Sequence, residues 1–122
     1  MARSDAGWEL EYTDTFGAWW DCLSQSEQVD VAAIIDLLVS RGPALPYPFS
    51  SKVVSSRYGQ MRELRIQHAG RPYRVLYAFD PRRVGILLLG GDKTGNDRWY
   101  EVAVPKADAL FALHLTLFSR DS

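Results

Sequence analysis

Charged and aromatic residues between positions 61 and 100 have the side chains needed to act on a phosphodiester. Together they supply a carboxylate, several cations and a phenol. The residues are Glu63, Arg65, Arg74, Lys93, Arg98 and Tyr100. A carboxylate that accepts a proton and cations that neutralise a phosphate are the components of a ribonuclease that works without metal. Arginine and glutamate in adjacent strands also form ordinary cross-strand ion pairs, so a structural role is the alternative.

Three predicted strands carry most of these residues. The patterns at 61–67, 73–79 and 84–89 indicate strands, and short turns separate them. Connections this short produce antiparallel neighbours. Within the central strand, Arg74 lies on the face opposite Tyr73. In the preceding strand, Glu63 shares a face with Arg65.

Helical signals flank this meander. Ser24 and Glu27 have capping-box spacing, and an apolar stripe follows until Gly42. Asp14 or Thr15 is expected to cap a shorter helix that holds Phe16, Trp19 and Trp20, and a further helix is expected to end near Phe118. The stripe of the central helix consists of Val31, Ile34, Ile35 and Leu38.

These elements predict an α+β protein with one domain over residues 1–122 and a core at about 8–118. We expect a small antiparallel sheet, made of an N-terminal strand at 8–13 and the three-stranded meander. Two N-terminal helices and one C-terminal helix complete the fold. In the first strand, the side chains expected to face inward are Trp8, Leu10 and Tyr12. Residues 43–52 and 90–97 are expected to be loops.

The net charge of −1 conceals two oppositely charged segments. Residues 1–56 have three basic and eight acidic residues, whereas residues 57–106 have ten basic and five acidic residues. The basic segment is suited to an anion such as a phosphate backbone. Arginines that keep a sheet edge soluble are the alternative explanation.

Several other function classes lack their sequence signals. The glycine-rich run at 90–95 is not a P-loop, because Asp92 and Leu87 occupy the required glycine positions. His68 and His114 lack further ligands at zinc spacing, so we expect no metal or cofactor. Cys22 is the single cysteine, which excludes an internal disulfide. The first seven residues have no apolar leader, and no run is long enough to span a membrane.

Four sequence motifs resemble the RelE/ParE superfamily of bacterial toxins, most closely its HigB-like, phage Gp49-like branch. The resemblance covers the element order from about residue 8 to 118 and is most specific over residues 61–100. The motifs are Glu63-Leu-Arg65, Tyr73-Arg-Val-Leu-Tyr77, Leu87-Leu-Leu-Gly-Gly-Asp-Lys93 and Trp99-Tyr100.

The resemblance implies a role for each member of the polar set. Arg74 would stabilise the phosphate, and Glu63 would accept the proton of the 2′-hydroxyl. Tyr100 would stack on a base or assist proton transfer, while Lys93 would stabilise the phosphate or the leaving group. Arg65 would hold the phosphate or lower the pKa of Glu63. Weaker candidates for RNA backbone contacts are Arg71, Arg98 and His68.

The resemblance further implies the toxin of a type II toxin–antitoxin system that cleaves messenger RNA on the ribosome without metal. Expected partners are the ribosome, messenger RNA and a cognate antitoxin in a hetero-oligomer, all in the bacterial cytoplasm and away from membranes. One alternative is a ParE-like toxin that binds and poisons DNA gyrase. Another is a catalytically inactive toxin that retains antitoxin binding.

Overall fold

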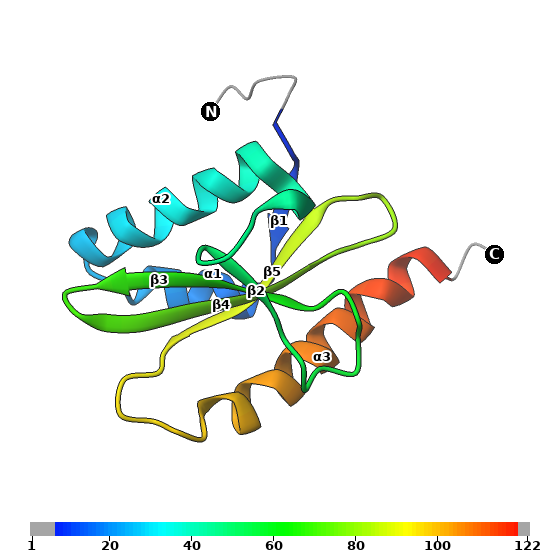
Figure 1. Cartoon of the computed structure of the whole chain (residues 1–122). Helices are drawn as coiled ribbons and strands as arrows, with labels where there is room; N and C mark the ends of the chain where they lie inside the picture. Colours follow the sequence, from blue (N-terminus) through cyan, green and yellow to red (C-terminus); the bar gives the residue numbers. More distant parts are fainter. Residues whose placement is uncertain (1–6, 120–122) are drawn as a thin grey trace.

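A five-stranded sheet with the order β1-β5-β4-β3-β2 lies between helices on its two faces (Figure 1). The computed structural model describes residues 7–119. The strands are β1 (Leu10–Tyr12), β2 (Ser50–Lys52), β3 (Arg62–His68), β4 (Arg71–Phe79) and β5 (Gly85–Asp92). The helices are α1 (Asp14–Asp21), α2 (Gln25–Arg41), the short 3-10 helix η1 (Gly42–Ala44) and α3 (Trp99–Ser119). The predicted α+β class and the predicted order of helices and meander are confirmed.

Each face of the sheet has its own apolar core. The face under α1 and α2 buries Val31 and Leu38 of α2 against the side chains of β3 and β4. The opposite face buries Leu76 and Leu88 against Phe111 of α3. The alternation of β4 therefore directs Tyr73 toward α2 and Arg74 toward α3. That these two side chains lie on opposite faces is what the sequence pattern predicts.

The sheet is mixed, and this corrects the prediction that it is antiparallel throughout. β3, β4 and β5 form the expected antiparallel meander, but β1 runs parallel to β5. Two helices separate β1 from the meander, so no tight turn fixes its direction. Tyr12 was also expected to face inward, yet it is 68% exposed and lines a hollow beside β1.

Both predicted loops contain strand. Within 43–52, Ser50–Lys52 forms β2 and pairs antiparallel with β3. Within 90–97, β5 continues to Asp92. A Cβ atom added at Gly90 would lie 2.4 Å from the Trp19 ring, and one at Gly91 would lie 2.6 Å from the Trp99 ring. These glycines therefore let two indole rings pack directly on the strand.

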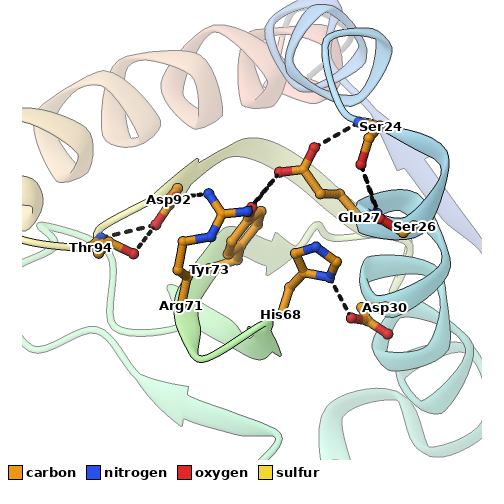
Figure 2. Close-up of polar contacts among 9 residues, drawn as sticks. All are labelled: Ser24, Ser26, Glu27, Asp30, His68, Arg71, Tyr73, Asp92 and Thr94. Atoms are coloured by element: carbon orange, nitrogen blue, oxygen red, sulfur yellow. Dashed lines mark hydrogen bonds and ion pairs between the residues drawn. The ribbon is translucent and has the colours of Figure 1, made fainter.

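A polar network fastens the β3–β4 hairpin to α2 (Figure 2). Glu27 forms the predicted capping box with Ser24, and its carboxylate also accepts a hydrogen bond from the Tyr73 hydroxyl. That bond and the Ser24 backbone amide lower the pKa of Glu27 to about 2. Burial, followed by the same bond, raises the pKa of Tyr73 to about 12. One carboxylate thus both starts α2 and anchors the hairpin.

Replacing Tyr73 with phenylalanine should destabilise the protein more at neutral pH than in acid. The bond favours ionised Glu27, so its stabilising effect is complete above the ordinary pKa of 4.5 and is lost as the pH falls toward about 2. Urea unfolding should show a larger difference between wild type and Tyr73→Phe at pH 7 than near pH 3.

Tyr77→Phe is the matched control for this experiment. The Tyr77 hydroxyl lies 2.6 Å from the Ser50 hydroxyl, so this hydrogen bond, unlike that of Tyr73, involves no carboxylate. Its effect on the free energy of unfolding should therefore be the same at both pH values. A Tyr73→Phe effect that is equally insensitive to pH would contradict the proposed linkage.

Candidate active site

Four of the predicted site residues meet on the face of the sheet covered by α3. Strand register places Arg65 of β3 directly opposite Arg74 of β4. Glu63 lies on the same face of β3, and the first turn of α3 adds Tyr100. We call Glu63, Arg65, Arg74 and Tyr100 the Glu63 cluster.

The Glu63 carboxylate is the centre of this cluster. Its Oε1 atom accepts a 2.5 Å hydrogen bond from the Tyr100 hydroxyl and lies 3.5 Å from Nε of Arg74. Its Oε2 atom lies 3.2 Å from a terminal guanidinium nitrogen of Arg65. The Arg74 Nε also donates to the Tyr100 hydroxyl at 3.3 Å. Both carboxylate oxygens are therefore engaged.

The members of the cluster differ in how far they are exposed to solvent. Glu63 and Arg74 are each 5% exposed, whereas the Arg65 side chain is 29% exposed. Two guanidinium groups surround one carboxylate, so the cluster carries excess positive charge. An excess cation beside a cleft is suited to attracting a phosphate group. Arg65 is the accessible cation, and Arg74 is the one held in place.

Tyr100 keeps its proton more firmly than an ordinary tyrosine. Burial raises its pKa, and the hydrogen bond to Glu63 raises it further. Lys93, which follows β5, has its ammonium nitrogen 5.8 Å from the centre of the Tyr100 ring. Lys93 therefore borders the cluster through this ring.

Two polar residues that the sequence analysis did not single out touch the cluster. Ser51 pairs with Glu63 across β2 and β3, and its hydroxyl donates to Oε2 at 2.6 Å. Tyr47 is 69% exposed, and the centre of its ring lies 5.2 Å from the guanidinium carbon of Arg65. Both belong to the segment that was expected to be loop. The β2–β3 register reveals Ser51, and the sequence alone carries no signal for it.

Hollows adjoin the cluster on two sides. One cavity of about 430 Å³ is lined by both Arg65 and Arg74, together with Phe49, and it extends to Asp30 and Ile34 of α2. A second cavity of about 580 Å³ is lined by Tyr100 and residues near the start of α3. A flexible chain passing over the cluster would therefore find recesses beside both guanidinium groups and beside the phenol.

The three weaker candidates lie outside the cluster. Arg71 is 3.0 Å from Asp92 and 3.6 Å from Glu27, and His68 is 2.6 Å from Asp30 (Figure 2). These contacts assign both residues to the junction between the hairpin and α2.

Arg98 is separate from that junction. Its side chain is 80% exposed and pairs with Glu101 at 3.2 Å. Of the three weaker candidates, Arg98 is therefore the most accessible to a ligand.

Two broader features follow from the described residues. Within 7–119, no group of three or more His, Cys, Asp or Glu side chains is placed to hold a metal ion. No helix of the same range is both long and apolar enough to cross a membrane.

Comparison with known proteins gives two similar relatives, both from Mycobacterium tuberculosis (strain ATCC 25618 / H37Rv). The chain is 47% identical to "Putative toxin HigB3" over 91 residues, which cover 74% of this chain and 78% of the relative. It is 39% identical to "Putative toxin HigB2" over 114 residues, which cover 92% of this chain and 56% of that relative. The chain thus spans a little over half the length of HigB2.

A family model agrees with these relatives. The model described as "Phage derived protein Gp49-like (DUF891)" matches residues 18–112, which include every member of the Glu63 cluster. The match extends over most of the chain, and it confirms the resemblance that the motifs indicated. The chain therefore belongs to the phage-derived Gp49-like family, in its HigB-like branch.

Proposed function

We propose that this chain is the toxin of a type II toxin–antitoxin system and that it cleaves messenger RNA on the ribosome without a catalytic metal. The observation that carries the proposal is the Glu63 cluster, in which a buried carboxylate, two guanidinium groups and a protonated phenol converge. The family relationship supports the toxin assignment through relatives that are named as toxins. The cluster supports phosphodiester chemistry.

In the proposed reaction, the ribose 2′-oxygen attacks the neighbouring phosphorus and the bond to the 5′-oxygen breaks. Arg65 and Arg74 neutralise the phosphate as negative charge develops on it. Glu63 accepts the proton of the 2′-hydroxyl. To reach the carboxylate, the 2′-hydroxyl must displace one of the hydrogen-bond donors that now contact Glu63. Lys93 adds positive charge near the leaving group.

Tyr100 completes the proton transfers. Its raised pKa keeps the hydroxyl protonated, so it can donate a proton to the departing 5′-oxygen. The proton gained by Glu63 then returns to Tyr100 through their 2.5 Å contact. Atoms and charges balance in this cycle, which yields a 2′,3′-cyclic phosphate and a free 5′-hydroxyl.

The proposed partners follow from this activity. Messenger RNA would approach across Arg65, with Arg98 as a further backbone contact because its side chain is exposed. Arg71 and His68 are weaker contacts, since both already pair with carboxylates. A cognate antitoxin would hold the toxin inactive in a cytoplasmic complex.

Arg74→Lys should abolish growth arrest while preserving the fold. Lysine keeps the charge but lacks the planar group that contacts Tyr100, Glu63 and the Tyr73 carbonyl at once. Inducible expression with matched protein levels should show arrest by the wild type and by the control Arg41→Lys, but not by Arg74→Lys. Full toxicity of a folded Arg74→Lys protein would exclude Arg74 from the reaction.

Glu63→Gln should slow the cleavage step without weakening binding. Glutamine keeps the size and shape of the side chain but is a poor proton acceptor, and its amide group replaces one of the two oxygens that accept hydrogen bonds. We therefore expect a loss of about 100-fold or more in single-turnover rate. The assay uses ribosomes programmed with a short messenger RNA, and ribosome binding is measured in parallel.

Glu9→Gln is the matched control, since Glu9 is exposed and lies on the opposite edge of the sheet. It should cleave at the wild-type rate. Equal losses of binding and cleavage in Glu63→Gln would instead make Glu63 a residue that positions the guanidinium groups. An unchanged cleavage rate would reject it as the base.

A further inference from the structure

A cavity of about 700 Å³ opens beside β1, at the edge of the sheet farthest from β2. Its walls are β1, α1 and α2, whereas the Glu63 cluster faces α3. The cavity is therefore separate from the cluster in both strand position and sheet face. We call it the β1 groove.

β1 offers backbone hydrogen-bonding groups to this groove. The carbonyl of Glu9 and the amide of Thr13 bond to β5, at 3.0 Å from Gly85 and 3.1 Å from Leu87. Alternate residues of a strand bond to the same neighbour. The N–H and C=O groups of Leu10 and Tyr12 consequently point toward the open side, where the sheet ends.

The walls of the groove are largely apolar. Leu10 and Tyr12 line it from the strand, Trp20 lines it from α1, and Ile35 and Val39 line it from α2. A strand added beside β1 would direct every second side chain into this space. The groove thus combines a backbone template with recesses for alternate residues.

Carboxylates surround the apolar walls. The lining includes four acidic residues and no basic residue, and Glu11 among the acids pairs with Arg82. The other three, Asp14, Asp21 and Asp36, are exposed and form no ion pair within residues 7–119. This uncompensated negative charge matches a cationic ligand.

We propose that the β1 groove binds an extended segment of a partner polypeptide, in which lysines or arginines are interspersed with apolar residues, and that this segment adds as a strand to β1. Because β1 has three residues, the paired part of the segment is short. Of the side chains that point into the groove, the apolar ones pack on its walls. The methylene stems of lysine or arginine cross these walls, so that their charged ends reach the three unpaired aspartates. This binding does not depend on the proposed ribonuclease activity.

The test uses labelled nine-residue peptides and the full chain. The first peptide alternates pairs of lysines with pairs of leucine or valine residues, so that both kinds of side chain point to each face of the added strand. The second replaces each lysine with glutamate, and the third places proline at its centre. Fluorescence anisotropy should detect binding of the first peptide, with at least tenfold weaker binding of the other two. Amide chemical shifts of Leu10 and Tyr12 should move when the first peptide binds.

Charge reversal identifies the site on the protein. The double variant Asp21→Lys, Asp36→Lys should weaken binding of the lysine peptide at least tenfold, since both side chains are exposed at the groove. Asp97→Lys is the control because Asp97 is exposed in the segment between β5 and α3, and it should change binding less than twofold.

Three outcomes would overturn the proposal. Equal weakening by Asp97→Lys would show unspecific attraction to the chain. Equal binding of the proline peptide would exclude strand addition. A dimer in sedimentation experiments without peptide, lost on substitution of Leu10 by proline, would assign the edge to a second copy of the chain.

Discussion

The burial of Arg74 in the middle of a sheet is the constraint on which the site depends. Strand register places Arg74 directly opposite Arg65, and like charges in such positions repel each other. Glu63 offsets this repulsion by contacting both guanidinium groups, and Tyr100 and Ser51 satisfy its remaining hydrogen-bonding capacity. The same contacts bring β2, β3, β4 and α3 to one point. The Glu63 carboxylate therefore both stabilises the sheet and holds the side chains of the site in place.

The two faces of the sheet carry different polar networks. On the α2 face, the Glu27 and Asp30 carboxylates engage the hairpin through Tyr73, Arg71 and His68 (Figure 2). On the α3 face, guanidinium groups outnumber carboxylates in the cluster and leave positive charge near Arg65. The acidic first half of the sequence therefore supplies α1, α2 and the rim of the β1 groove, whereas the basic segment supplies the cluster.

Local sequence signals predict the features of this fold that depend on nearby residues. The capping box at Ser24 and Glu27 and the alternation that separates Arg74 from Tyr73 are of this kind. The parallel direction of β1 and the pairing of Ser51 with Glu63 depend on residues distant in sequence. Local signals also do not explain why glycine is required at positions 90 and 91, because the indole rings that pack on them belong to Trp19 and Trp99 in other elements. The sequence thus predicts which residues form the cluster's core, but not the partners that complete it.

We propose that the Glu63 cluster cleaves messenger RNA during translation. Mapping transcript 5′ ends in cells after brief induction tests it most directly, with the wild type and Glu63→Gln compared at equal protein levels. Cleavage by the Glu63 cluster should produce new ends within translated regions, in phase with codons, that carry a 5′-hydroxyl and are absent with Glu63→Gln. Growth arrest with intact transcripts would contradict it and would point to a protein target such as DNA gyrase.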